Sequence, residues 1–210
     1  HLVNLGVDAN EAPLEDSGEH ITPEEAHRFI ESQDCQKVVL DARNGFESRI
    51  GKFENAKAPD IEHFRDLPDY IEQHKDEFKD KDVLMYCTGG IRCERASALL
   101  KQKGIARNVY QLEGGIHKYV EKYPDGHFRG KNYVFDGRIS VRVTNDVLTC
   151  CDICGTTYDV YTNCINAVCN KHCIICPDCI RQYNNTCSSE CYNAVMNQDT
   201  PQRSIIRAKE

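Results

Sequence analysis

Residues 82–104 of this 210-residue chain, DVLMYCTGGIRCERASALLKQKG, decide its fold. The apolar run from Asp82 to Tyr86 is typical of a strand buried in a parallel sheet. The residues from Arg92 to Lys103 predict a helix, which Gly104 ends. Between them, Gly89 and Gly90 allow the chain to curl tightly. A strand, a glycine loop and a helix in this order indicate an α/β domain.

The flanking residues extend this pattern. Thr22-Pro23-Glu24-Glu25 has the form of a capping box and predicts a helix to about Ser32. Ile61 to Lys79 predicts two short helices, or one broken at Pro68. Three further elements are predicted, namely strands at Lys37–Asp41 and Asn108–Leu112 and a helix at Gly115–Lys122. Strands that alternate with helices predict an open, mostly parallel sheet with helices on both faces.

Cys87 stands where the central strand meets the glycine loop. Inward-facing N–H groups and the positive end of the following helix would stabilise a thiolate there. Arg92 and Arg95 supply nearby cations, and such surroundings lower a thiol pKa from about 8.5 to roughly 3.5–7.5. We interpret Cys87 as a nucleophile. The plainer alternative is a buried cysteine above an ordinary glycine turn. The expected cradle for an anion or substrate comprises Thr88, Gly89, Gly90, Ile91 and Arg95.

Ten of the 13 cysteines lie between Cys150 and Cys191. Thiolates at the observed spacings suit tetrahedral zinc, so we predict two structural zinc ions, whose binding supplies folding energy to a segment with few large apolar side chains. Sequential and interleaved sites are both open, and disulfides or an iron–sulfur cluster are the alternatives. Cys150, His172 and Cys173 are left over as substitute ligands. The eight predicted ligands form the pairs Cys151/Cys154, Cys164/Cys169, Cys176/Cys179 and Cys187/Cys191.

Charge and composition divide the chain near residue 130. Residues 1–125 carry 17 Lys/Arg against 25 Asp/Glu, and residues 126–210 carry 9 against 8. The acidic first part argues against non-specific nucleic-acid binding, and we expect no DNA partner. The longest apolar run has five residues, Val83–Cys87, so we expect neither a membrane span nor a signal peptide. The expected absence of a signal peptide and the paired spacing of the cysteines together predict that the protein resides in the reducing cytoplasm.

The pattern Cys-x-x-Gly-x-Arg, here Cys87, Gly90 and Arg92, resembles the active-site loop of the rhodanese family, in which the cysteine is the nucleophile. Leu40-Asp41-Ala42-Arg43 with Phe46-Glu47 resembles the family's Asp-x-Arg and Tyr-Glu segment, and Leu112-Glu113-Gly114-Gly115 resembles its late Asp-Gly-Gly turn. The resemblance implies supporting roles for Asp41, Arg43 and Glu47. Cys93, expected one to two turns into the helix, either resolves an oxidised or persulfidated Cys87 or simply packs there. Four residues separate Cys87 from Arg92, and related phosphatases have a longer loop, so the loop length favours sulfur chemistry.

Residues 86–94, the segment GKNYVFDGR at 130–138 and the cysteine-rich tail together resemble the rhodanese-domain tRNA uridine-34 hydroxylases of bacteria. Gly137 departs from that family's Phe-Asp-Glu-Arg. The resemblance implies an oxidoreductase that converts the wobble uridine of tRNA to 5-hydroxyuridine, with molecular oxygen as co-substrate and with Cys87 and Arg92 as catalytic residues. Cys87 would add to C6 of the uracil ring or carry a persulfide.

The expected organisation is a linker (1–19), a rhodanese domain (20–125), a connecting segment (126–149), a zinc module (150–195) and a tail (196–210). The chain opens on His1 rather than Met, and family members carry a ferredoxin-like domain before this point. We therefore expect a fragment that binds tRNA weakly if that domain helps to hold tRNA.

Two other functions remain open. One is a rhodanese sulfurtransferase that carries a persulfide on Cys87, and the other is a non-enzymatic rhodanese-like interaction module joined to a zinc adaptor. The sequence contains no flavin or dinucleotide fingerprint, and spacing identifies no cluster of two histidines and one carboxylate.

Overall fold

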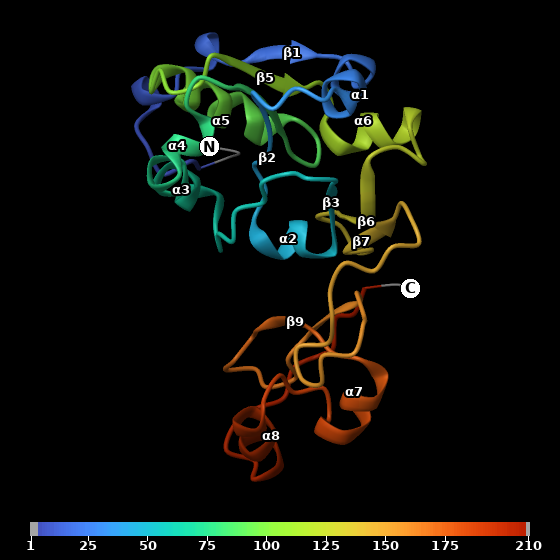
Figure 1. Ribbon diagram of the computed structural model, residues 1–210. Coiled ribbons are helices and arrows are strands. Elements are labelled where there is room, and N and C mark those ends of the chain that lie inside the picture. Colours follow the sequence, from blue (N-terminus) through green and yellow to red (C-terminus); the bar gives the residue numbers. More distant parts are fainter. Residues whose placement is uncertain (1–3, 209–210) are drawn as a thin grey trace. The chain divides into compact units, whose positions relative to one another are not determined.

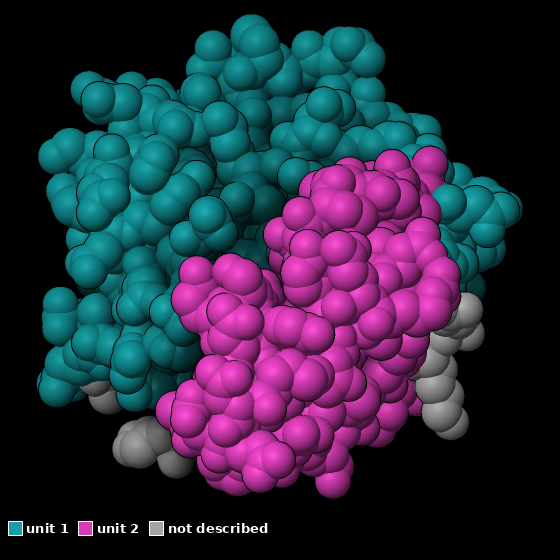
Figure 2. All heavy atoms as spheres, turned by 90° about the horizontal axis from the view of Figure 1, so that it is seen from below, with its two compact units in different colours: residues 1–132, 142–145 teal, residues 133–141, 146–210 magenta. Residues whose placement is uncertain are grey.

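The computed structural model describes residues 4–208, so the outermost ends of the expected linker and tail, residues 1–3 and 209–210, lie outside the described residues. Most of its helices and strands are labelled in Figure 1. The chain forms two compact units, coloured separately in Figure 2. One comprises residues 1–132 and 142–145, and the other comprises residues 133–141 and 146–210.

The first unit is built on a parallel sheet. Its strands are β1 (Glu19–Ile21), β5 (Asn108–Leu112), β4 (Asp82–Tyr86) and β2 (Lys37–Asp41), in that spatial order. The ranges of β2, β4 and β5 are those predicted, and β2 and β4 show the central apolar run expected of strands buried on both faces. The predicted open parallel sheet is therefore confirmed.

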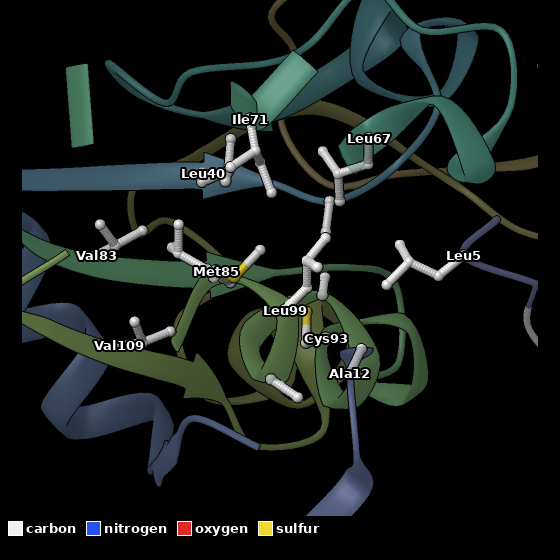
Figure 3. Close-up of a cluster of buried hydrophobic side chains, with 14 of the residues drawn as sticks. Leu5, Ala12, Leu40, Leu67, Ile71, Val83, Met85, Cys93, Leu99 and Val109 are labelled. Atoms are coloured by element: carbon white, nitrogen blue, oxygen red, sulfur yellow. The ribbon is translucent and has the colours of Figure 1, made fainter. Parts of the chain in front are cut away.

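Alternate residues of β4 enter two separate hydrophobic clusters, one on each face of the sheet. Val83 and Met85 pack with Leu99 of α5 (Ile91–Gln102) in the cluster of Figure 3. Leu84 and Tyr86 pack in the other cluster, which includes side chains of α1 (Pro23–Glu31) and α6 (Gly115–Lys122). Helices therefore cover both faces, as predicted.

The residues expected to form a linker contribute to the core instead. Two short 3₁₀ turns, η1 (Ala9–Glu11) and η2 (Leu14–Asp16), precede β1. Leu5 and Ala12 are each only 1% exposed and belong to the same cluster as Met85 (Figure 3). These two apolar residues show no periodicity, which is why the sequence pattern did not reveal their burial.

The helices follow the local signals closely. The capping box of α1 is confirmed, with Thr22 N–H donating to Glu25 Oε2 at 2.8 Å. The region after Ile61 contains η3 (Phe64–Asp66), α3 (Leu67–Gln73) and α4 (Lys75–Phe78). The break lies at His74 rather than at Pro68, because proline is readily accommodated in a first helical turn. The elements β3 (Gly51–Phe53) and β6 (Phe128–Tyr133), which the sequence did not predict, pair antiparallel, and α2 (Gly45–Ile50) precedes β3.

The second unit has little regular structure. It contains an antiparallel pair, β8 (Tyr161–Asn163) and β9 (His172–Ile174), and two helices, α7 (Pro177–Tyr183) and α8 (Ser189–Met196). The short strand β7 (Ser140–Arg142) follows β6 along the chain. The expected tail begins within α8, and Ala208 N–H donates to Tyr161 O at 2.8 Å, so the chain returns to β8. Among residues 4–208, no helix combines the length and the apolar character needed to cross a membrane.

Candidate active site and metal centres

The side chain of Cys87 is enclosed by its own loop. Cys87 follows the last residue of β4 and is 2% exposed. Gly90 N–H donates to Cys87 Sγ at 3.1 Å, and Gly90 has a φ of 94°, a conformation that residues with a side chain rarely adopt. Backbone N–H groups directed at a sulfur atom stabilise negative charge on it.

The pKa of Cys87 is lowered to about 6. A hydrogen bond from the thiol of Cys93 is the largest cause, burial acts in the opposite direction, and the Arg92 guanidinium and the N–H groups of Arg92 and Cys93 lower the pKa further. Burial and the hydrogen bond to Cys87 raise the pKa of Cys93 well above its usual value, so Cys93 keeps the proton that it donates. At pH 7 a thiol of pKa about 6 is roughly nine-tenths thiolate.

Cys93 lies closer to the loop than the sequence indicated. It is the third residue of α5, within the first helical turn, and not one to two turns along the helix. A start at either Arg92, as expected, or Ile91, as observed, places Cys93 in the first turn of this helix. Cys93 is completely buried, and its hydrogen bond to Cys87 gives it a direct electrostatic role.

Arg92 is held in place by Glu47. Its Nη1 donates to Glu47 Oε2 at 2.5 Å and its Nη2 donates to Oε1 at 2.7 Å, a bidentate pair. The Glu47 side chain is completely buried and that of Arg92 is 13% exposed. Thr88 Oγ1 lies 3.3 Å from both Glu47 Oε1 and Arg92 Nη2. These contacts fix the guanidinium beside the Cys87 loop.

Asp41 and Arg43 form a second, fully buried ion pair at the ends of β2 and β4. Arg43 Nη2 lies 2.7 Å from Asp41 Oδ2, and both side chains are inaccessible to solvent. Tyr86 OH donates to the same Asp41 oxygen at 2.7 Å, and Arg43 Nη2 also donates to Gly51 O at 2.7 Å. This network ties the two strand ends together immediately before Cys87.

The Gly114-Gly115 turn supports the loop from α6. Ile116 N–H donates to Cys87 O at 2.9 Å, and His117 N–H donates to Thr88 O at 3.1 Å. Gly115 has a φ of 61°, and a Cβ there would lie 2.4 Å from Cys87 O. Only glycine fits this close approach, which gives the late glycine pair of the sequence a structural reason.

Three residues of the expected cradle contact the N-terminal segment or face solvent. Arg95 was predicted to supply a cation, but its Nη2 donates to Asp8 O at 3.2 Å and lies 3.4 Å from Val7 O, so it binds the N-terminal segment. A Cβ at Gly89 would meet no atom within 4 Å, and Ile91 is 64% exposed. Gly89 and Ile91 therefore lie on the solvent side of the loop.

The eight paired cysteines converge in two groups of four. Cys151, Cys154, Cys176 and Cys179 form one group, Cys164, Cys169, Cys187 and Cys191 form the other, and the sulfur atoms of each group all lie within 4.8 Å of one another. The fold therefore selects the interleaved arrangement. Representative sulfur separations are 3.6 Å for Cys154 and Cys176 and 3.5 Å for Cys169 and Cys187, far beyond a disulfide bond of about 2.05 Å. Four thiolates so placed can hold a metal ion.

The loops around these groups suit metal ligands. Gly155 N–H donates to Cys151 O at 3.0 Å, and Gly155 has a φ of 73°, so the chain turns sharply after the first pair. The leftover residues lie outside both groups: Cys150 is exposed, Cys173 is buried, and the His172 ring stacks on Tyr161.

The structure also brings together three residues that sequence spacing did not connect. His27 and Glu31 of α1 and His127, which precedes β6, form a cluster in the first unit. The i, i+4 spacing of His27 and Glu31 was the available signal, but nothing in the sequence linked it to a histidine 96 residues beyond Glu31.

Comparison with known proteins agrees with this architecture. A family model described as a rhodanese-like domain matches residues 22–122, and one described as the rhodanase C-terminal segment matches residues 129–192. A tRNA uridine(34) hydroxylase of Chlamydia abortus is 45% identical over 200 residues, which cover 92% of this chain and 60% of that protein. A protein of the same name from Cytophaga hutchinsonii is 43% identical over 182 residues, which cover 85% of this chain and 57% of that protein. This chain thus spans about 60% of the length of the curated relatives that it matches. The chain belongs to the rhodanese-like family, in the group whose rhodanese-like domain is followed by a rhodanase C-terminal segment.

Proposed function

We propose that this chain carries the rhodanese-type active site of an enzyme that hydroxylates the wobble uridine of tRNA to 5-hydroxyuridine. The observation that carries the proposal is the 45% identity to a tRNA uridine(34) hydroxylase over a region that includes both the Cys87 loop and the cysteine-rich tail. Because the substrate is tRNA, we place the reaction in the cytoplasm. Binding by this part of the protein alone is expected to be weak, since its first 125 residues are acidic.

Cys87 and Arg92 are the proposed catalytic residues. A buried thiolate with a pKa of about 6 is available as a nucleophile at neutral pH. Its addition to C6 of the uracil ring would make C5 electron-rich. One atom of molecular oxygen would then be incorporated at C5, while two electrons and two protons from an external reductant would convert the other atom to water. Arg92, fixed by Glu47, offsets the thiolate charge, while Gly89 and Ile91 form the open side of the loop where a base would approach.

We assign a structural role to the two cysteine groups and propose zinc as their metal. Four thiolates and no open ligand position are typical of structural zinc sites. The second unit has a small apolar cluster, made largely of cysteines, so metal binding would contribute much of its folding free energy.

The test is mass spectrometry of tRNA nucleosides from cells that lack the full-length protein and are supplied with either the native or the Cys87→Ser gene. We expect 5-hydroxyuridine and its derivatives at the wobble position to return with the native gene and not with Cys87→Ser. A matched control is Cys35→Ser, because Cys35 is exposed and remote in sequence from the loop. Full restoration by Cys87→Ser would exclude Cys87 from the reaction.

Sulfur transfer is the second candidate function. The Gly90 N–H bond to Cys87 Sγ and the four-residue spacing to Arg92 would equally hold a persulfide. Transfer of sulfur from thiosulfate to cyanide by the purified chain, lost in Cys87→Ser, would favour this function if wobble uridine in the cells is unaffected.

A further inference from the structure

A second cluster of potential ligands lies outside the Cys87 loop. His27 and Glu31 are four residues apart on α1, so they share one face of the helix. His27 Nε2 lies 3.2 Å from Glu31 Oε1, and His127 Nε2 lies 3.6 Å from the same oxygen. We propose that His27, Glu31 and His127 bind a divalent transition-metal ion, separately from the two cysteine centres.

The surroundings of His127 leave the correct nitrogen free for a metal. Its Nδ1 lies 3.1 Å from Glu54 Oε2, and Glu54 Oε1 accepts a hydrogen bond from Arg129 Nε at 2.7 Å. A carboxylate at Nδ1 favours the tautomer with the proton on that nitrogen, which directs the Nε2 lone pair outward. Within the described part of the chain, His127 Nε2 is buried and has no hydrogen-bond partner. A metal ion would supply one.

The ring of His27 is positioned by two residues of or next to α6. Its Nδ1 lies 2.8 Å from Tyr119 OH, and that hydroxyl also accepts a hydrogen bond from the backbone N–H of His127 at 3.2 Å. The His27 ring stacks on Tyr123 with centroids 4.1 Å apart and planes 7° apart. Both imidazoles are therefore held by their Nδ1 atoms, and both present Nε2 to Glu31.

The spacing and the donor set agree with a transition metal. Nitrogen and oxygen ligands bind zinc at about 2.0–2.2 Å, so neighbouring ligand atoms around one ion lie roughly 3–3.5 Å apart. The observed separations of 3.2 and 3.6 Å are close to this range. Two imidazoles and one carboxylate suit zinc, iron(II), cobalt(II) or nickel(II), whereas calcium and magnesium prefer oxygen.

Three protein ligands leave a coordination position open. The Glu31 side chain is 54% exposed, and Glu31 and Glu54 both line a cavity of about 320 Å³ within the first unit. Water or a small ligand can therefore reach the carboxylate and complete the coordination sphere.

The experiment is a titration with Ni²⁺ of the full chain loaded with two equivalents of zinc, one for each cysteine group, followed by isothermal calorimetry and elemental analysis. We expect one additional equivalent of nickel with no loss of zinc, and at least a tenfold weaker affinity in Glu31→Gln. Glu31 is exposed, so this variant keeps the fold, and the exposed Glu121→Gln is the matched control that should bind as the native chain does. Nickel is paramagnetic, so the NMR signals of His27 and His127 should shift in the native chain.

Three results would overturn the proposal. One is the absence of an additional equivalent, and another is equal affinity in the native chain and Glu31→Gln. The third is nickel uptake matched by zinc release, which would place the nickel at the cysteine centres. None of these results depends on hydroxylase activity.

Discussion

Replacing Cys93 tests the electrostatics of the candidate active site directly. The Cys93 thiol donates a hydrogen bond to Cys87, and this bond is the largest cause of the lowered pKa of Cys87. Cys93→Ala removes the donor, whereas Cys93→Ser replaces it with a hydroxyl donor. The pair therefore separates the hydrogen bond from the general effect of altering a buried position.

The expected change in the pKa of Cys87 on replacing Cys93 can be worked out from the amount by which that pKa is lowered. Lowering the pKa of Cys87 from 9.0 to about 6 corresponds to about 4 kcal/mol in favour of the thiolate, at about 1.36 kcal/mol per unit. A hydrogen bond to a charged group contributes about 1.5–3 kcal/mol, so its loss should raise the pKa by about one to two units. We expect a midpoint near pH 7–8 in Cys93→Ala and one near 6 in Cys93→Ser. At pH 7 the thiolate fraction would fall from about nine-tenths to about one half or less.

The assay is the rate of alkylation by iodoacetamide as a function of pH, with Cys87 followed by peptide mass spectrometry so that the other cysteines do not contribute. Circular dichroism of both variants verifies that they are folded. An unchanged midpoint in Cys93→Ala would refute the assigned hydrogen bond. A native midpoint at or above about 8.5, the value of a free thiol, would refute the thiolate site altogether.

The remaining predictions concern pH, the supporting turn and the metal groups. Because the pKa of Cys87 is lower in the folded chain than in the unfolded chain, its stabilising effect is complete above about pH 9 and is lost as the pH falls through about 6. Denaturant unfolding should therefore show that native stability relative to Cys87→Ser rises by up to about 4 kcal/mol across this range, and a constant difference would argue against the shift. Gly115→Ala should cost at least about 2 kcal/mol of unfolding free energy, through its positive φ and the contact with Cys87 O, whereas Gly89→Ala should be nearly neutral. Elemental analysis should find one metal ion lost in Cys154→Ser/Cys176→Ser and two lost in Cys154→Ser/Cys164→Ser, and the reverse pattern would mean sequential sites.

Local signals predicted the sheet well and its periphery poorly. The strands β2, β4 and β5 were predicted residue by residue, and β2 and β4 have the apolar run between polar residues that a strand buried on both faces requires. The pairing of β3 with β6 joins segments more than 70 residues apart, and neither is a long apolar run. Burial of Leu5 likewise depends on tertiary contacts, which no local period records.

The candidate site also has features that the local sequence predicts and features that depend on tertiary contacts. Cys87, Gly90 and Arg92 stand together in one loop, so their association could be predicted from the order of residues along the chain. The choice between interleaved and sequential metal groups could not be predicted from the sequence, because both arrangements use the same four cysteine pairs. Only the fold decides which pairs meet. The contact of Arg95 with Asp8 O joins segments 87 residues apart, and no local pattern in the sequence indicates it.

The charges at the loop are best understood as matched sets rather than as independent residues. A buried charge without a partner costs several kcal/mol of folding free energy. Each charged group near Cys87 therefore requires a group of opposite charge or a hydrogen-bonding partner. Glu47 of α2 forms an ion pair with Arg92, and the thiol of Cys93, which keeps its proton, donates a hydrogen bond to the thiolate of Cys87. At the end of the neighbouring strand β2, Asp41 forms an ion pair with Arg43. An additional cation placed at the loop would therefore not lower the pKa of Cys87 by its own charge alone. It would also compete for Glu47 and release Arg92 from the position that the ion pair now fixes.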